Sequence, residues 1–308
     1  VRRVSPGATA PAAGGVLPVD KPEGPTSHDV VAMARKVLDT QRIGHAGTLD
    51  PFASGLLLLC VGSATRLAEY LVGLEKAYLA TARLGVRTDT DDREGDAVRV
   101  RDGWEAVAPD DVRAALADLT GTIDQVPPPY SAKKVSGESA HRLARRGETP
   151  ELAPVSVTVH ELELLELEPP DVRFRVRCSS GTYVRALARD LGEALGVGAH
   201  LTSLRRTRIG PFEADDAAPG GELTAEAVRR VWIEPLDAVG HLPRVDVDDE
   251  DAWRLATGQG IDVPTGLSDA VADDDPVAVA RGGELAAVAL RSGRTLRTRK
   301  VFVQPARP

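Results

Sequence analysis

The feature that most constrains the fold of this chain is a run of six consecutive apolar residues at positions 56–61 (LLLLCV). The run is too short for a typical core helix and follows a segment rich in glycine, so it predicts a strand that lies wholly in the core. The preceding residues 42–55 (RIGHAGTLDPFASG) carry three glycines and a proline without apolar periodicity, which predicts a loop. We therefore expect a polar loop that leads directly into the centre of the core.

The rest of the chain predicts strands and helices in mixed order. A short apolar strand (GVLPVD) precedes a Pro/Gly loop, after which Thr26 or Ser27 is suited to cap a helix. Apolar periodicity further predicts helices at 109–119, 183–195 and 224–232, and strands at 76–84, 155–164, 172–178 and within 277–303. Without a regular βαβ rhythm, this order predicts an α+β fold with a mixed, largely antiparallel sheet and flanking helices.

Changes in composition divide the chain into three expected parts. Residues 1–14 read as a disordered leader, residues 15–240 as one large domain, and residues 241–308 as a small β-barrel domain. No run of about 18 apolar residues occurs, so no membrane span is expected. The two cysteines, Cys60 and Cys178, lie in apolar or alternating segments and are predicted to be buried thiols rather than a disulfide.

Charge is unevenly distributed along the sequence. The formal net charge of −8 taken as an average argues against a polyanionic partner. However, residues 173–210 carry eight Arg against two acids, and residues 131–150 carry five Lys or Arg against two acids. Two such stretches can build a phosphate-binding surface on an acidic protein, although solvated surface arginines are the simpler alternative.

Asp50 is the first candidate catalytic residue. It lies in the glycine-rich loop with His45, beside the predicted core strand, so its carboxylate would be rigidly held and still reachable. A carboxylate in such a place can act as a covalent nucleophile. Taken alone, Asp50 could equally start a turn and His45 could be a structural loop residue.

Four further segments could bear chemistry, and each also has a purely structural interpretation. Lys76 and Tyr78 lie on a predicted strand. Residues 178–185 (CSSGTYVR) pass from a strand end into a helix, a junction where ligands often bind. Residues 204–212 hold three arginines, and residues 127–146 combine three prolines with a basic stretch. No zinc spacing, P-loop or dinucleotide fingerprint occurs, so neither a metal nor a nucleotide cofactor is expected.

Five segments in the same order resemble the TruB family of pseudouridine synthases. They are VDKPEGPTSHD, RIGHAGTLDPFASGLLLLCVGSATRL, KAYLATARLGVRTDTDD, VPPPYSAKKVSGESAHRLARRGE and CSSGTYVRALARDLGEALGVGAHLTSLRRTRIGPF, which together cover roughly residues 15–240. Residues 241–308 more loosely resemble the PUA-type RNA-binding domain that these enzymes append. The resemblance implies a cytoplasmic isomerase that converts uridine 55 in the T loop of tRNA into pseudouridine without a metal or organic cofactor.

The resemblance also implies a role for six residues of the expected pocket. Asp50 matches the nucleophile, Arg185 the arginine that forms an ion pair with it, and Tyr78 the tyrosine that stacks on the target base. His45 matches a histidine associated with reception of the flipped nucleotide, and Tyr183 and Leu204 match further pocket positions. Extruding a stacked uracil costs a few kcal/mol, and stacking on Tyr78 would recover about 1–3 kcal/mol.

Residues 127–147 match an arm that the family places over the tRNA. The basic residues expected to contact RNA are Lys21, Lys133, Lys134, Arg142, Arg145, Arg146, Arg205, Arg206, Arg208, Arg297 and Arg299. The last two belong to residues 291–300, which hold four Arg and one Lys with no acid. The expected partner is the T-arm of tRNA, with no protein partner required and a monomeric enzyme.

Several alternatives stay open at this level. The sequence does not distinguish attack of Asp50 at C6 of the base from attack at C1′ of the ribose, or from a glycal route with Tyr78 or Asp50 as the base. A guide-RNA-dependent relative is the nearest rival function, and the arm at 127–147 favours a stand-alone enzyme over it. A non-catalytic tRNA-binding or folding factor, and an enzyme acting on a free nucleoside, are the rivals from other classes.

Overall fold

The computed structural model describes residues 14–131, 134–135, 138–139, 146, 152–264, 266–267 and 270–302. Its largest element is a ten-stranded sheet with the order β14-β1-β3-β12-β4-β11-β10-β7, in which β2 also pairs with β3 and β13 with β12. The strands are β1 (Gly15–Lys21), β2 (Ile43–His45), β3 (Ser54–Val61), β4 (Lys76–Leu84), β7 (Gly121–Gln125), β10 (Val155–Glu168), β11 (Asp171–Cys178), β12 (Ala199–Ile209), β13 (Phe212–Glu213) and β14 (Ala218–Pro219).

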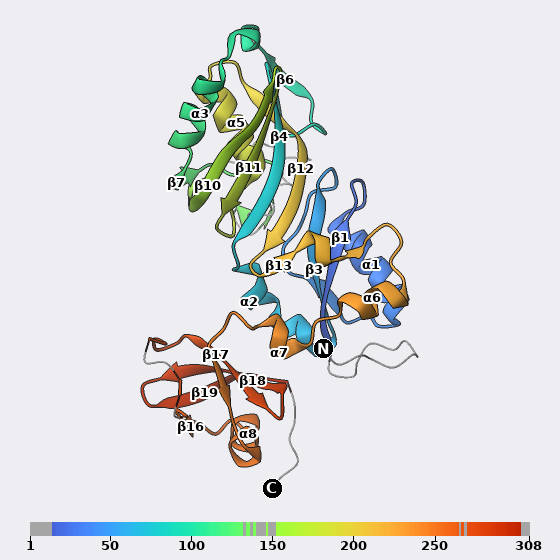
Figure 1. The fold of residues 1–308 in the computed structure, drawn as a ribbon, viewed down its shortest axis with the longest axis vertical. Helices are drawn as coiled ribbons and strands as arrows, with labels where there is room; N and C mark the ends of the chain where they lie inside the picture. The colour runs from blue at the N-terminus through green and yellow to red at the C-terminus, as the bar shows by residue number, and fades with distance from the viewer. Residues whose placement is uncertain are drawn as a thin grey trace.

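Most neighbouring strands of this sheet run antiparallel. Only the pairs β1/β14 and β3/β12 are parallel. The prediction of an α+β fold on a mixed, largely antiparallel sheet is therefore confirmed (Figure 1).

Strand β3 carries the apolar run and lies in the core as predicted. Leu57 and Leu59 pack on one side against helix α1 (Ser27–Leu38), while Leu56 and Leu58 pack on the other side near the segment 62–72. All four leucine side chains are fully buried, because the strand has apolar contacts on both faces. The N-cap of α1 is Thr26, which is one of the two residues proposed for this role. Its side chain accepts a hydrogen bond from the Asp29 amide.

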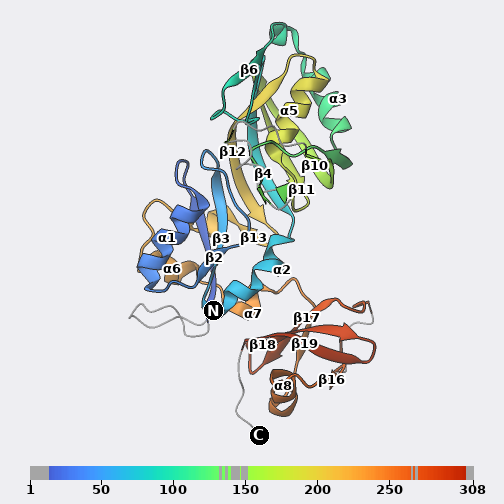
Figure 2. The same cartoon turned by 180° about the vertical axis from the view of Figure 1, so that it is seen from behind.

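Two helices cover one face of the part of the sheet formed by β4, β10 and β11. Helices α3 (Pro109–Asp118) and α5 (Val184–Ala194) lie behind β4, β10 and β11 in Figure 1 and in front of them in Figure 2. Side chains alternate between the two faces of β11: Phe174 and Val176 are buried beneath the helices, whereas Arg173 and Arg175 on the other face are exposed. The first turn of α5 therefore lies at the end of β11, beside the centre of the sheet.

The shorter elements connect these layers. They are the 3₁₀ helices η1 (Gly62–Leu67), η2 (Trp104–Ala106) and η3 (Ala214–Asp216), the helices α2 (Ala68–Val72), α6 (Ala225–Val231) and α7 (Pro235–Ala238), and the hairpins β5 (Val86–Thr88) with β6 (Ala97–Val100) and β8 (Lys134–Val135) with β9 (Glu138–Ser139). In the described part of the chain, no helix has the length and apolar character needed to span a membrane.

The C-terminal residues form a second sheet with the order β15-β17-β18-β19-β16. It comprises β15 (Arg244–Asp246), β16 (Ile261–Asp262), β17 (Pro276–Arg281), β18 (Glu284–Ser292) and β19 (Thr295–Val301), with helix α8 (Asp249–Ala256) beside it. The predicted domain boundary near 240 falls between α7 and β15. The two parts nevertheless touch: Arg66 Nη1 donates to the Val301 carbonyl at 2.6 Å, and Lys300 pairs with Glu69.

Four further sequence predictions concern the loop at 42–55, the two cysteines, the leader and the arm. Residues 43–45 form a short strand paired with β3, so the prediction of a continuous loop from 42 to 55 was wrong at its start. Cys60 and Cys178 are free and buried, as predicted. The predicted leader at 1–14 and the predicted arm at 127–147 lie largely outside the described residues.

Candidate functional site

A cavity of about 320 Å³ opens where the loop before β3, the strands β4 and β12 and the first turn of α5 meet. It is lined by residues 47–50, Val72, Lys76, Tyr78, Tyr130, Ser131, residues 179–185, Leu204 and Arg206. Five of the six predicted pocket residues are therefore brought together, although they come from four distant segments of the sequence. Among the described lining residues, Asp50 is the only carboxylate.

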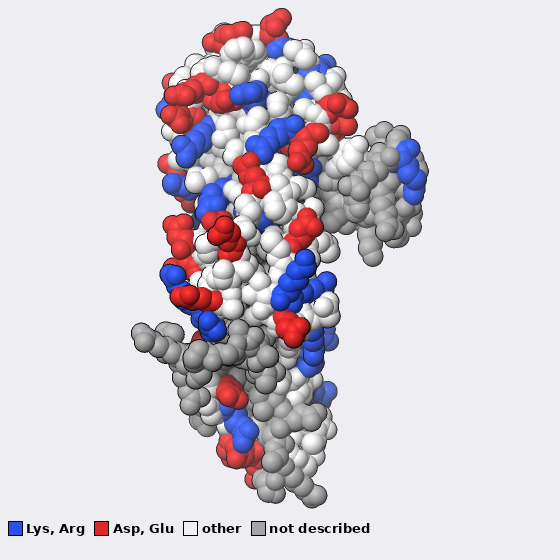
Figure 3. All heavy atoms as spheres, turned by 90° about the vertical axis from the view of Figure 1, so that its right-hand side faces the viewer, with Lys and Arg blue, Asp and Glu red and all other residues white. Residues whose placement is uncertain are grey.

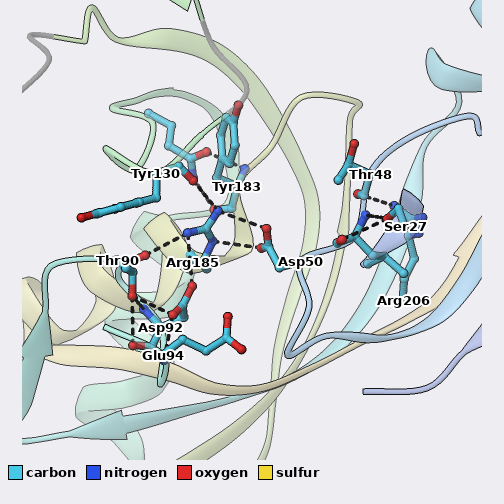
Figure 4. A network of polar contacts seen from close by, with 12 residues as sticks. Ser27, Thr48, Asp50, Thr90, Asp92, Glu94, Tyr130, Tyr183, Arg185 and Arg206 are labelled. Carbon is cyan, nitrogen blue, oxygen red and sulfur yellow. Dashed lines mark hydrogen bonds and ion pairs between the residues drawn. The ribbon is translucent and has the colours of Figure 1, made fainter. Parts of the chain in front are cut away.

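The loop that carries Asp50 is held by buried side chains on both sides. Arg206 donates to the carbonyls of Gly47 at 3.1 Å and Thr48 at 3.3 Å, and the Ser27 hydroxyl donates to the Leu49 carbonyl at 3.0 Å. The Ser27 hydroxyl also accepts from the Leu49 amide at 2.9 Å. Because consecutive peptide groups are fixed, the Asp50 backbone has little freedom (Figure 4).

Two of the predicted RNA contacts prove to be part of this support. Lys21 is fully buried and donates to the carbonyls of Pro22, Pro25 and Pro51 at 2.9, 2.7 and 3.2 Å. Its ammonium group already has three carbonyl acceptors, so the predicted contact with RNA would require the loss of one of these hydrogen bonds. Arg206 is 2% exposed and lines the cavity, so the predicted contact with RNA could be made only from inside the cavity.

A glycine makes this close packing feasible. Gly55 at the start of β3 has φ +105°, and a Cβ placed there would lie 2.2 Å from the Arg206 carbonyl oxygen. Any other residue would push β12 away from β3, and with it the guanidinium that anchors the loop.

Arg185 is the central polar group of the site. Its Nε lies 3.0 Å from Asp50 Oδ2, and Nη2 donates to Asp50 Oδ1 at 3.3 Å. Nη1 donates to Asp92 Oδ2 at 3.2 Å and to the Thr90 carbonyl at 3.0 Å, and Nη2 also donates to the Tyr130 carbonyl at 2.9 Å. Four hydrogen bonds from the two terminal nitrogens, together with the close approach of Nε to Oδ2, therefore fix the guanidinium beside Asp50 (Figure 4).

Asp50 combines deep placement with access. Its side chain is 34% exposed, toward the cavity, whereas the Arg185 side chain is only 7% exposed. Burial raises the pKa of the Asp50 carboxyl, and the Arg185 guanidinium opposes that rise. The ion pair therefore keeps an ionised carboxylate available at a place where desolvation disfavours it.

Asp92 belongs to this network and was not singled out from the sequence. It is 4% exposed, and its Oδ1 accepts from the Thr90 hydroxyl at 2.6 Å and from the Glu94 amide at 3.0 Å. The segment RTDTDD offered a signal, since polar residues crowd around a short strand, but it holds three aspartates. Nothing in the sequence indicates which of the three points at Arg185.

Tyr78, Leu204 and Tyr183 form the less polar walls. Tyr78 on β4 is 8% exposed, and Leu204 on the neighbouring β12 is 6% exposed. Tyr183 is fixed by two backbone bonds with Gln125, whose side chain accepts from its amide at 2.8 Å and donates to its carbonyl at 3.1 Å. Burial raises the pKa of the Tyr78 phenol, so the ring is a neutral surface at ordinary pH.

His45 is not among the residues that line the cavity. It ends β2, and its ring meets that of His28 edge-on with centroids 5.5 Å apart. Burial lowers the pKa of His45, so the imidazole is favoured in its neutral form. Its expected contact with the flipped nucleotide is the one pocket assignment that the cavity does not include.

The other predicted RNA contacts fall into three groups. Arg205 is half-buried and forms a two-pronged pair with Asp20, with both nitrogen–oxygen distances at 2.9 Å. Arg208 is half-buried, and Arg146, Arg297 and Arg299 are exposed. The side chains of Lys133, Lys134, Arg142 and Arg145 lie outside the described residues.

Charge is mixed on one face of the protein. On the face seen in Figure 3, Lys and Arg side chains are interspersed with Asp and Glu. Within the described ranges, no group of three or more His, Cys, Asp or Glu side chains is arranged to hold a metal ion.

Comparison with known proteins gives consistent matches. Residues 35–184 match the family model described as TruB family pseudouridylate synthase (N terminal domain), and residues 185–239 match that described as tRNA pseudouridylate synthase B C-terminal domain. The chain is 49% identical to tRNA pseudouridine synthase B of Aromatoleum aromaticum, over 82% of this chain and 83% of the relative. It is 44% identical to the protein of that name from an Arthrobacter species, over 91% of this chain and 93% of the relative.

A solved structure resembles the fold over nearly the whole chain. It is a chain in the crystal structure of the archaeal box H/ACA sRNP Nop10-Cbf5 complex, with a TM-score of 0.72, 31% sequence identity, and coverage of 95% of this chain and 87% of that one.

Proposed function

Because the chain belongs to the TruB family of pseudouridine synthases, we propose that this tRNA pseudouridine synthase isomerises uridine 55 in the T loop of tRNA. The observation that carries the proposal is Asp50. It is the only carboxylate among the described residues that line the cavity, and Arg185 grips both of its oxygens. The U55 position rests on the family resemblance of the sequence motifs.

The reaction is an isomerisation, so its atoms must balance within the nucleotide. The bond from N1 of uracil to C1′ of the ribose breaks, the base rotates, and a new bond forms from C5 to C1′. The hydrogen on C5 is released as a proton, and N1 gains a proton. The enzyme therefore has to hold a detached uracil and stabilise the electron-poor ribose beside it.

The cavity suits both tasks. Tyr78 and Leu204 provide an apolar wall against which a base can stack and turn. The Asp50 carboxylate faces the same space as a nucleophile that can form a covalent bond with C1′ or C6, and Arg185 holds it in one orientation. The substrate has to be extruded from its loop to reach this depth.

The pKa directions favour one general base in a glycal route. Burial raises the pKa of Tyr78 above its ordinary value, so the phenol rarely loses its proton near neutral pH. The Asp50 pKa is also raised, which makes its carboxylate a better proton acceptor than a free one. If a proton leaves C2′, we therefore assign it to Asp50 rather than to Tyr78.

A guide-RNA-dependent activity is the second candidate, because the Cbf5 structure is similar at 31% identity. The curated relatives at 44–49% identity carry the name tRNA pseudouridine synthase B, which favours direct action on tRNA. We propose a monomer that needs no protein partner and works in the cytoplasm with its tRNA substrate. Conversion of an unmodified tRNA transcript without guide RNA would separate the two activities.

The direct test uses a T-arm stem-loop transcript labelled with tritium at C5 of uridine. Turnover releases tritium from C5, and nucleoside analysis identifies pseudouridine and its position. Asp50→Asn should bind the RNA within a few-fold of the parent and release no tritium, whereas the exposed carboxylate variant Asp118→Asn should behave like the parent. Parent-like turnover by Asp50→Asn would remove the nucleophile assignment, and product at another uridine would remove the U55 assignment.

A further inference from the structure

Lys76 is a buried cation of the cavity to which the proposed reaction gives no task. It begins β4, is 6% exposed, and lines the same cavity as Asp50 and Tyr78. Its ammonium donates to the Leu74 carbonyl at 2.5 Å and to the Val72 carbonyl. The Ser180 hydroxyl donates to the same Val72 carbonyl at 2.7 Å, so this acceptor is held from two sides.

Lys76 has no carboxylate partner among the described residues. The groups that affect its charge are Arg206, a second buried cation, and the Cys178 thiol. Burial with a like charge nearby lowers the pKa of Lys76 to about 8. The carbonyls at the end of α2 offset part of the cost, since a helix C-terminus attracts cations. An ammonium has three donors, and two carbonyls use only two of them.

The position of Lys76 relative to Tyr78 indicates which part of a substrate could accept a hydrogen bond from the third N–H group of the ammonium. The two residues lie two positions apart on one face of β4, so their Cα atoms are roughly 6–7 Å apart. Tyr78 forms the wall for the base, while Val72 beside Lys76 is 40% exposed and marks the outer rim. A nucleotide whose base stacks on this wall would have its sugar and phosphates toward the rim, beside Lys76.

We propose that Lys76 binds a phosphodiester next to the extruded uridine and so positions the nucleotide over Asp50. This assignment rests on the proposed function, since it requires an RNA substrate. Lys76 is thereby a positioning residue. It supplies a point charge at the rim of the cavity, a common way of holding phosphate. The bond is made in the bound substrate as well as in the transition state, so its loss should raise KM more than it lowers kcat.

The test is a double-substitution cycle between protein and RNA. Lys76→Met keeps most of the length of the side chain and removes the charge, and Lys76→Arg keeps the charge. On the RNA side, a neutral methylphosphonate replaces in turn each of the two phosphates flanking the target uridine. Lys36→Met, an exposed site on α1, controls for the loss of one positive charge. Thermal unfolding of each variant reports whether the fold persists.

We expect Lys76→Met to lower kcat/KM about 10- to 100-fold, mainly through KM, as loss of a charge-assisted hydrogen bond predicts. Lys76→Arg and Lys36→Met should stay within a few-fold of the parent. One methylphosphonate should lower the parent's kcat/KM to a similar degree and cost Lys76→Met almost nothing further.

Two results would overturn the assignment. One is full additivity at both phosphates, which would assign Lys76 to a base carbonyl or to the RNA elsewhere. The other is a loss of activity in Lys76→Met that is fully accounted for by a lower melting temperature. That result would mean that Lys76 only stabilises the end of α2. Absence of pseudouridine from the parent enzyme with unmodified RNA is a separate outcome, which refutes the proposed function itself.

Discussion

Replacement of Arg185 by methionine separates the structural from the chemical role of the buried guanidinium. The substitution removes four hydrogen bonds and the Nε contact with Asp50, but the abandoned acceptors differ in their surroundings. The Asp92 side chain is 5% exposed, whereas Asp50 is 34% exposed and can be solvated from the cavity. Removing one partner of a buried ion pair typically costs about 3–5 kcal/mol in the free energy of unfolding. We expect most of that cost to come from Asp92.

The prediction is tested by urea unfolding of Arg185→Met, Asp92→Asn and the double variant. Asparagine at 92 retains an oxygen for the Thr90 hydroxyl and the Glu94 amide but carries no charge. The double variant should recover more than half of the stability that Arg185→Met loses, without any recovery of pseudouridine formation.

Arg83→Met provides the matched control, because Arg83 makes an equally two-pronged pair with Asp171 at the surface. Its side chain is 48% exposed, so the expected cost is at most about 1 kcal/mol. The reasoning fails if Arg83→Met costs as much as Arg185→Met. It also fails if Asp92→Asn leaves the Arg185→Met variant no more stable than before.

Three further predictions follow from the geometry. Burial raises the pKa of Asp50 above 3.8, and the ionised carboxylate is the reactive form. The single-turnover rate should therefore fall as the pH is lowered, with a midpoint above pH 3.8. A rate that stays constant down to about pH 4 would contradict this prediction. The Arg93 guanidinium lies over the Phe52 ring at 5.6 Å and so connects the loop of residues 89–96 to the loop that carries Asp50. Arg93→Ala should slow single turnover about 3- to 10-fold with little change in the free energy of unfolding. Unchanged kinetics would show that this contact is dispensable. Charge reversal of the exposed Arg297 and Arg299 should weaken tRNA binding and flatten its salt dependence, as measured by filter binding at several salt concentrations, and unchanged affinity would remove both from the RNA surface.

The sequence predicted the elements that depend on local pattern. The apolar run became β3, the alternating residues 76–84 became β4, and Thr26 capped α1 as a short polar side chain should. The family resemblance of the motifs implied six pocket residues, and all of them except His45 line the cavity. The weak point was the loop at 42–55, where Ile43–His45 forms a strand because β3 offers it hydrogen-bonding partners. That pairing is a long-range contact without a local signal.

The destination of individual charged side chains was not predictable. Arg205 and Arg206 are neighbours on β12, yet one pairs with Asp20 near the surface and the other is 2% exposed beneath the catalytic loop. Alternation along a strand says that they point to opposite faces but not which face is buried. Lys21 and Asp92 illustrate the same limit, since each is buried by segments remote in the sequence.

The buried charges also explain how an acidic chain can attract a polyanion. Four buried cations surround the catalytic loop and cavity, namely Lys21, Lys76, Arg185 and Arg206, against the two carboxylates Asp50 and Asp92. The site therefore holds two more positive than negative charges, although the chain as a whole carries −8. Salt screens buried charges much less than exposed ones. The attraction within the cavity should thus persist at salt concentrations that weaken the binding of RNA by the outer arginines. We therefore expect the surface arginines to capture tRNA first and the buried cations to retain the extruded nucleotide.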